Sequence, residues 1–382
     1  MCFGFQESNR LLRKEMTSST IEKGISIDLI DTPCLLVDMA LVEKNLKTLF
    51  SKLSGTNVKV RPHLKTVKSP EFAKLLLAAG ATGVCVAKLS EAEVMAAAGI
   101  EDILITTEIM GAPKLERLEK LIAKHAQVKV VIDSAVGACA MQNAAKNAGV
   151  KLSVFLELNV GQNRAGVEPG EPALRIANEI SKQSNLQLIG IQGYEGHLQL
   201  LPDETERKRL CAESMEKLMS TVALLRQNGH KIDVITTGGT GTSEYCVEAG
   251  ANEVQPGSFI FMDVAYRRAI GQRYENALTV VSTVISKPSE SRCVIDAGFK
   301  SLSTDSGNAE LRSHTNMTYR PAGDEHGIIE SSNSKLQLEI GDRVELIPSH
   351  IDTTVNLHDY YYCHRGGRIE NVWRLSARGK VQ

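Results

Sequence analysis

The sequence has no excess of charge of either sign. Its 382 residues include 44 lysines and arginines against 45 aspartates and glutamates, which gives a formal net charge of −1 at pH 7. Proteins that bind nucleic acids or anionic membrane surfaces do so through an excess of basic residues. The sequence also has no apolar run of the roughly 18 to 20 residues that a membrane span needs. We therefore expect neither a nucleic-acid-binding protein nor a membrane protein.

Paired cysteines are missing too. The eight cysteines are scattered along the chain and no C-x-x-C motif occurs. In a chain of this length, such cysteines are typical of reduced, buried thiols in a cytoplasmic protein. Residues 1–24 lack the apolar segment of a secretion signal, and Glu7, Glu15 and Glu22 are unusual in a transit peptide. We expect residues 1–24 to form a loose arm of a cytoplasmic protein.

What the sequence does have is a regular alternation of two patterns. Short runs rich in β-branched residues are separated by amphipathic segments such as "SPEFAKLLLAAG" (69–80), which end on glycine as helices often do. The predicted strands are 58–61, 83–87, 103–106, 128–132, 153–158, 188–193, 232–236 and 252–255. Eight such alternations predict an α/β fold, a (β/α)8 TIM-like barrel. A doubly wound sheet is the alternative, but no G-x-G-x-x-G motif opens its first helix.

The alternation stops near residue 274. The later stretches "LTVVSTVISKP", "SRCVIDAG", "GDRVELIP" and "RIENVWRLSARG" read as strands joined by short turns. They predict a separate antiparallel β domain over 274–382, after a barrel over 41–273. The early run "TPCLLVDM" lies in 25–40, a segment that we expect to contribute a strand to the β domain.

Chemically capable residues follow three of the predicted barrel strands. Lys65 follows the first strand, while "TTGGTGT" (236–242) and "QPGSF" (255–259) follow the seventh and eighth. Active sites of such barrels lie at these strand ends, and the last two loops often bind phosphate. Glycine lets backbone N–H groups approach a phosphate, and hydroxyl groups add donors. A lysine beside a phosphate site indicates pyridoxal phosphate held as a Schiff base. A sugar-phosphate barrel, whose lysine pairs with a substrate anion, is the alternative.

Several motifs together resemble one enzyme family. They are "DTP" (31–33), "RPHLKT", "VAKLSEAE", "GQNRAGV", "GYEGHLQ", "TGGT" and "PGSF". They resemble the fold-type III pyridoxal-phosphate family that contains D-threonine aldolase and D-serine dehydratase. The resemblance spans residues 28–375, and "RPHLKT" together with "PSHID" is its most specific part. It implies a barrel of the alanine-racemase type and a homodimer.

The resemblance also implies roles for individual residues. Lys65 would hold the cofactor covalently, and Arg164 would face the pyridine nitrogen, where a cation makes the cofactor a weaker electron sink. Tyr194 would lie beside the cofactor and His197 near the substrate, as a candidate general base, with a metal-bound hydroxide as the alternative. The predicted cofactor-binding residues are Lys65, Arg164, Tyr194, Thr237, Gly239, Thr240, Gly257 and Ser258, and the predicted catalytic residues are Lys65 and His197.

A second diagnostic stretch is "IPSHIDTTVN" (347–356). We expect His350 and Asp352 to end a strand of the β domain, so that both side chains point to one face. H-x-D alone is too common to indicate a metal, but the resemblance implies a metal pair here. D-serine dehydratases carry H-x-C, which favours zinc, whereas the hard oxygen of aspartate suits manganese or magnesium. We predict a divalent cation, Mn2+ first, with Mg2+, Co2+ and Zn2+ as alternatives.

These expectations combine into one function with three rivals. We expect a metal-activated, pyridoxal-phosphate-dependent D-threonine aldolase, a lyase that cleaves D-β-hydroxy-α-amino acids to glycine and an aldehyde. A dehydratase of D-serine or D-threo-3-hydroxyaspartate would use the same site. A racemase needs no metal, and a non-enzymatic cofactor-binding barrel needs no β domain. The resemblance further suggests that "DAGFKSLSTDSG" (296–307), Glu325 and His326 approach the site.

Overall fold

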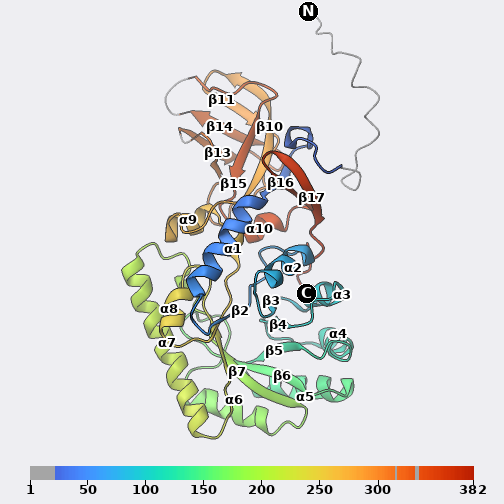
Figure 1. Cartoon of the computed structure of the whole chain (residues 1–382), viewed down its shortest axis with the longest axis vertical. Coiled ribbons are helices and arrows are strands. Elements are labelled where there is room, and N and C mark those ends of the chain that lie inside the picture. Colours follow the sequence, from blue (N-terminus) through green and yellow to red (C-terminus); the bar gives the residue numbers. More distant parts are fainter. Residues whose placement is uncertain (1–21, 315, 332–334) are drawn as a thin grey trace, which may run out of the picture.

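The computed structural model describes residues 22–314, 316–331 and 335–382. Of the predicted N-terminal arm, residues 1–21 lie outside the described residues. Figure 1 shows two parts along the long axis of the molecule, a helix-rich part and a β-rich part, with helix α1 (Met39–Leu53) running between them.

Eight parallel strands form the helix-rich part. They are β2 (Lys59–Val60), β3 (Val84–Val86), β4 (Ile103–Ile105), β5 (Val128–Ile132), β6 (Leu152–Glu157), β7 (Leu186–Gln192), β8 (Val234–Thr237) and β9 (Glu253–Val254). Their order in the sheet is β2-β9-β8-β7-β6-β5-β4-β3. A parallel bridge between His63 and Cys85 joins the two ends of this order, so the sheet curls round on itself. The predicted TIM-like barrel is confirmed.

Helices cover the outside of these strands. They are α2 (Pro70–Ala78), α3 (Leu89–Ala97), α4 (Ala112–Ile122), α5 (Ala135–Ala148), α6 (Glu171–Ser181), α7 (Glu204–Gln227) and α8 (Ser243–Glu248). Helix α9 (Val264–Ile270) lies instead beside the second sheet, where the Val264 N–H donates to the Pro348 carbonyl (Figure 1). Local chemistry explains their ends. The Ser134 hydroxyl accepts a hydrogen bond from the Gly137 N–H (3.1 Å) and caps α5, which stops at Gly149 with φ of 69°.

The barrel core is made of the β-branched runs. Val84, Ile103, Val128 and Val154 are fully buried. Burying an aliphatic side chain of this size contributes about 1.5–3 kcal/mol to stability. These strands therefore hold the loops at their carboxyl ends on a rigid base.

One ion-pair network is buried at the barrel wall. The Arg61 side chain is 6% exposed and its Nε donates to Glu253 Oε1 at 3.0 Å. Its Nη1 pairs with Asp102, which also accepts a hydrogen bond from Lys129 Nζ at 2.6 Å. The Glu253 side chain is 2% exposed, so Arg61 is what compensates its buried charge.

The second sheet is β-rich and mixed. Its strands are β1 (Cys34–Asp38), β10 (Leu278–Ser289), β11 (Arg292–Ile295), β12 (Glu310–Leu311), β13 (Met317–Pro321), β14 (Gly327–Ser331), β15 (Arg343–Ile347), β16 (Tyr360–Arg365) and β17 (Arg368–Arg374). Strand β1 pairs antiparallel with β10 and parallel with β16. The antiparallel expectation is therefore correct except for the β1–β16 pair. These two strands lie at opposite ends of the chain, so no short turn forces them to run antiparallel.

The segment with His350 and Asp352 does not end a strand, and this corrects the expectation from sequence. Strand β15 stops at Ile347, because the next residue is Pro348, which has no backbone N–H. His350 is the N-cap of a short helix, α10 (Ile351–Val355), and has extended backbone angles (φ −140°, ψ 119°). Asp352 lies in the first helical turn. The bend at the helix start, rather than the alternation of a strand, decides where the two side chains point.

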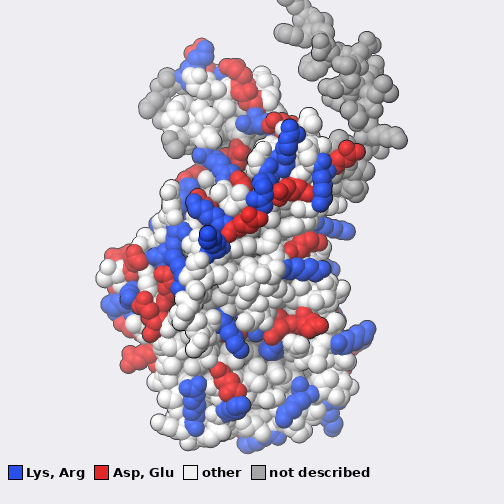
Figure 2. Space-filling model, viewed as in Figure 1, with Lys and Arg blue, Asp and Glu red and all other residues white. Residues whose placement is uncertain are grey.

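No helix in the described ranges is both long and apolar enough to cross a membrane. Figure 2 shows basic and acidic side chains interspersed over the visible face of the molecule.

Candidate active site

A cavity of about 460 Å3 opens at the carboxyl ends of the barrel strands. Loops that follow most of the barrel strands contribute to it, and so does helix α10 from the second sheet. Its polar lining residues include His63, Lys65, Lys88, Thr106, Glu108, Glu157, Arg164, Gln192, Tyr194, Gln199, Thr240, Gln255, Ser258, Asp263, Tyr266, His350 and Asp352. This cavity is the candidate active site.

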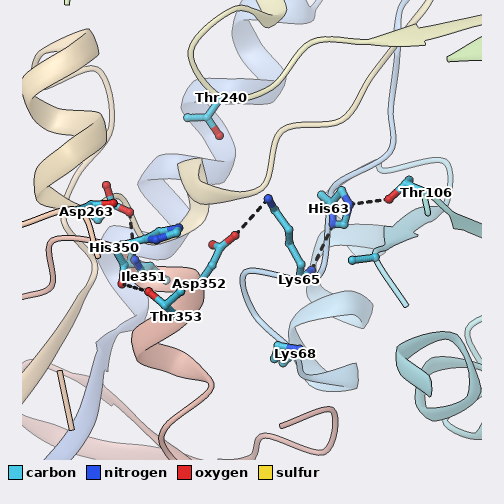
Figure 3. A network of polar contacts seen from close by, with 12 residues as sticks. His63, Lys65, Lys68, Thr106, Thr240, Asp263, His350, Ile351, Asp352 and Thr353 are labelled. Atoms are coloured by element: carbon cyan, nitrogen blue, oxygen red, sulfur yellow. Dashed lines mark hydrogen bonds and ion pairs between the residues drawn. The ribbon is translucent and has the colours of Figure 1, made fainter. Parts of the chain in front are cut away.

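Lys65 enters the cavity from a turn directly after β2. Its backbone N–H donates to His63 Nδ1 at 3.3 Å, and His63 Nε2 lies 3.0 Å from Thr106 Oγ1 (Figure 3). Thr106 Oγ1 donates its own proton to the Val86 carbonyl, so His63 Nε2 must be the donor in that contact. Burial, with Lys65 nearby, lowers the pKa of His63 to about 3. His63 is thus a neutral ring that fixes the lysine backbone.

Lys65 and Asp352 point toward each other across the cavity (Figure 3). Lys65 Nζ lies 3.4 Å from Asp352 Oδ2. The carboxylate raises the pKa of Lys65, although burial opposes this effect. Burial would raise the pKa of Asp352, but Lys65 and His350 outweigh it and the pKa is lowered. The other oxygen, Asp352 Oδ1, is buried and has no hydrogen-bond partner among the described residues.

The two glycine-rich loops meet at the far side of the cavity. The Phe259 N–H donates to Thr240 Oγ1 at 3.1 Å, which ties the loop after β9 to the loop after β8. A Cβ on Gly257 would stand 2.8 Å from Thr66 Oγ1, and one on Gly239 would stand 2.5 Å from Gln199 Oε1. Neither position has room for a side chain, so glycine permits Gly257 to pack against the turn after β2 and Gly239 against the loop after β7.

Thr237 does not line the cavity. It is buried, and its hydroxyl lies within hydrogen-bond distance of the Gly193 carbonyl (2.5 Å) and Glu195 Oε2 (2.6 Å). Glu195 also accepts a hydrogen bond from Gln199 Nε2 at 3.0 Å. Thr237 and Glu195 therefore brace the loop after β7 against the loop after β8.

His197 does not line the cavity either. It belongs to a short helix, η3 (Gly196–Leu198), and its side chain is exposed. A Cβ on Gly161 would stand 3.2 Å from its ring, so the imidazole lies close to the loop after β6. Its sequence neighbours Gly196, Gln199 and Leu200 do line the cavity.

Arg164 and Tyr194 lie together on the barrel side of the cavity. The Arg164 guanidinium is 5.7 Å from the centre of the Tyr194 ring, within the range of a cation–π contact. Two glutamates, Glu108 and Glu157, line the same cavity, and burial raises the pKa of each carboxyl group. Glu157 Oε2 accepts a hydrogen bond from Gln192 Nε2 at 2.5 Å.

His350 and Asp352 both line the cavity, and two further carboxylates hold the His350 ring and the backbone between the two residues. His350 Nδ1 lies 2.6 Å from Asp305 Oδ2. Asp263 Oδ2 accepts the Ile351 N–H at 3.1 Å, between the two residues of the pair. Within the described ranges, no cluster of three or more histidine, cysteine, aspartate or glutamate side chains has the arrangement of a metal site. A cation here would have two protein ligands and need water or substrate for the rest.

The cavity thus brings together most of the residues singled out from the sequence. Those that line it are Lys65, Arg164, Tyr194, Gly239, Thr240, Gly257, Ser258, His350 and Asp352. Neither Glu325 nor His326 is among the lining residues, and Glu325 instead pairs with Lys300 at 2.5 Å in the second sheet.

Sequence reasoning missed several polar residues of the site. Glu108, Glu157 and Gln255 stand at or just beyond the ends of predicted strands, a position that could have pointed to them. Asp305 lies in the quoted stretch 296–307, but nothing in the sequence separates it from Asp296 in the same stretch.

Fold and cavity define a class: a barrel of the alanine-racemase type with a lysine after its first strand and glycine-rich loops after its last two. The family model "Alanine racemase, N-terminal domain" matches residues 37–265, and "Putative serine dehydratase domain" matches 277–364. The chain belongs to the fold-type III pyridoxal-phosphate family that contains the D-threonine aldolases and the D-serine dehydratases.

Individual relatives match almost from end to end. A D-threonine aldolase from Arthrobacter sp is 35% identical over 97% of this chain and 99% of its own. A 3-hydroxy-D-aspartate aldolase from Paracoccus denitrificans (strain Pd 1222) is 34% identical over 94% of each chain. The crystal structure of D-threonine aldolase from Filomicrobium marinum is 36% identical, with a TM-score of 0.91 over 95% of this chain and 99% of that one.

Proposed function

We propose that this protein is a metal-activated, pyridoxal-phosphate-dependent D-threonine aldolase. It cleaves the Cα–Cβ bond of D-β-hydroxy-α-amino acids to give glycine and an aldehyde. The observation that carries the proposal is the 3.4 Å distance between Lys65 Nζ and Asp352 Oδ2. A cofactor held by the lysine and a cation held by the carboxylate would therefore be close enough to act on the same small substrate. Relatives named as aldolases, at 34% and 35% identity over nearly the whole chain, support the same reaction.

We assign the covalent attachment of the cofactor to Lys65. Bound there, pyridoxal phosphate supplies an electron sink for the electron pair of the broken bond. Arg164 and Tyr194 are suited to hold its ring, since both line the cavity and contact each other. The phosphate is assigned to the loops of Gly239, Thr240, Gly257 and Ser258, because all four residues line the cavity and the two hydroxyl groups can donate to a phosphate. Thr237 supports these loops from behind.

We assign a divalent cation to His350 and Asp352. The fit is supported by the unpartnered, buried Asp352 Oδ1 and by the contact of His350 Nδ1 with Asp305, which leaves His350 Nε2 as the free nitrogen. The cation supplies Lewis-acid chemistry that makes the β-hydroxyl of the substrate more acidic. Mn2+ is our choice, because one imidazole and one carboxylate form a mixed, mostly hard ligand set.

The β-hydroxyl proton needs an acceptor, which we propose is His197. The two imidazoles among the described lining residues are already engaged, His63 with Lys65 and Thr106, and His350 with Asp305. Partial burial of the ring lowers the pKa of His197, so the ring is mostly neutral near pH 7 and able to accept a proton. A turn of helix η3 toward the cavity would bring it to the substrate, since Gly196 already lines that wall.

A dehydratase is the second candidate. D-threo-3-hydroxyaspartate dehydratase from Delftia sp. (strain HT23) is 25% identical over 92% of this chain. In such a reaction Lys65 would take the Cα proton and the same cation would assist loss of the hydroxyl group. The two reactions therefore share a site and differ in the bond that breaks.

A product assay separates the two reactions. Purified protein is incubated with pyridoxal phosphate, Mn2+ and D-threonine, with L-threonine as the matched control. Glycine and acetaldehyde in equal amounts are the expected products. Ammonia with 2-oxobutanoate would instead establish the dehydratase and overturn the aldolase.

We further propose a cytoplasmic homodimer. All seven cysteines among the described residues are free thiols, which supports a reducing compartment. Sedimentation of the cofactor-loaded protein tests the dimer, and a mass of 41.6 kDa would contradict it.

A further inference from the structure

A loop of the second sheet is fastened to the helix that carries His350 and Asp352. The loop runs between β11 and β12. The Ser303 N–H donates to Thr354 Oγ1 at 3.2 Å, and Ser349 Oγ donates to the Ser303 carbonyl at 3.2 Å. These two bonds reach α10 and the residue before His350. These bonds therefore fix the position of the loop relative to His350 and Asp352, the proposed metal pair.

Asp305 is the carboxylate that this loop presents. Its Oδ2 lies 2.6 Å from His350 Nδ1, and its Oδ1 accepts hydrogen bonds from Ser303 Oγ (2.6 Å) and Thr353 Oγ1 (2.9 Å). Both hydroxyl groups can donate, so the carboxylate is satisfied as an ionised acceptor. An ionised carboxylate accepts only, so the proton in the contact with His350 sits on Nδ1.

We propose that Asp305 is a positioning residue of the metal site, which keeps His350 in the tautomer and orientation that present Nε2 to a divalent cation. The inference rests on the metal pair of the proposed function. Metal-binding histidines commonly donate their other ring N–H to a carboxylate, which fixes the ring and strengthens the ligand. Asp305 makes this contact from outside the cavity, so it touches neither cofactor nor substrate.

A purely structural role for Asp305 would leave a different signature. The Asp305 and His350 side chains are 45% and 30% exposed, and polar contacts this exposed to solvent contribute little to folding. Removing the carboxylate should therefore weaken cation binding strongly and change the unfolding midpoint only slightly. These two quantities can be measured separately.

The test is a titration of Mn2+ into the cofactor-loaded protein, with free Mn2+ followed by electron paramagnetic resonance. Asp305→Asn keeps the size of the side chain, but its amide can donate to Nδ1 and favour the wrong tautomer. We expect it to bind Mn2+ about 10- to 100-fold more weakly than the unchanged protein. Asp359→Asn is the matched control, because Asp359 also forms an exposed ion pair, with Arg378 at 3.1 Å, and lies outside the cavity. We expect that variant to bind Mn2+ as the unchanged protein does.

A second variant guards against loss of the fold. Asp305→Ala leaves space for a small carboxylate, so added acetate should recover part of the Mn2+ affinity. If Asp305→Asn binds Mn2+ as tightly as Asp359→Asn, the inference is overturned while the metal pair stands. If the unchanged protein binds Mn2+ no more tightly than His350→Ala does, no cation binds at this site. That result would overturn both the metal pair and the role of Asp305.

Discussion

Lys65 and Asp352 lie on opposite walls of one cavity, with Lys65 Nζ 3.4 Å from Asp352 Oδ2. Lys65 follows the first barrel strand, whereas Asp352 lies in helix α10, which follows strand β15 of the second sheet. Each alters the ionisation of the other, because the carboxylate raises the pKa of the lysine and the ammonium lowers that of the aspartate. The proposed cofactor and cation are thus brought to the same substrate by the packing of two sheets.

Lys65→Ala should abolish covalent attachment of pyridoxal phosphate, because it removes the amine to which we assign the Schiff base. The protein is loaded with pyridoxal phosphate, the unbound cofactor is removed by dialysis, and the absorption spectrum of the protein then measures the attachment directly. Lys44→Ala is the control, because Lys44 is exposed and pairs with Glu275 away from the cavity. A protein-bound visible band that survives Lys65→Ala would exclude Lys65 as the anchor.

Asp352→Ala should leave the cofactor bound and lower the rate of aldol cleavage by about a hundredfold or more, the scale of a lost Lewis acid. Treating the unchanged protein with a chelator should produce the same loss, and Mn2+ should reverse it. The retained cofactor spectrum shows that the variant is folded. Full activity of Asp352→Ala in the presence of chelator would rule out the metal pair.

His197→Asn should lower kcat by about 10²- to 10⁴-fold if His197 is the general base. His230→Asn is a matched control, because His230 has a lowered pKa and bonds to Asn178 far from the lining residues. Equal rates for the two variants would mean that solvent, and not His197, accepts the β-hydroxyl proton.

Stability of the cofactor-free protein should fall as the pH drops below about 6.5, in part through His63. Its pKa is near 6.5 when unfolded and about 3 when folded, so between these values the unfolded chain binds the extra proton. The contribution of His63 has a slope of at most about 1.4 kcal/mol per pH unit, with stability rising as pH rises. Urea unfolding from pH 4 to pH 8 should show a smaller slope for His63→Gln. An unchanged slope would mean that His63 titrates normally.

Arg61→Ala should lower the free energy of unfolding by about 3–5 kcal/mol, because it leaves Glu253 buried without a counter-charge. Arg320→Ala, which breaks an exposed pair with Glu330, should cost at most about 1 kcal/mol. Urea unfolding of both variants measures the difference. Similar losses would show that water reaches Glu253 once Arg61 is removed.

Much of the barrel was predictable because its information is local. The run that became β5 was predicted as 128–132 and spans Val128–Ile132. By contrast, the strand expected to end at His350 and Asp352 stops at Ile347, before Pro348, and the two residues belong to the cap and first turn of α10. The apolar residues before His350 and Asp352 suggested that the strand continues through them, but Pro348 ends the strand first.

The sequence by itself determined the barrel, the lysine after its first strand and the glycine-rich loops after its last two strands. Each of these depends on residues within a few positions of one another, where backbone preference and side-chain alternation act. The tertiary structure alone decided that Asp352 faces Lys65, that Asp305 supports His350 and that the His197 ring lies outside the cavity. These contacts join segments far apart in the chain, and their distances come from how the two sheets pack, which no local pattern encodes.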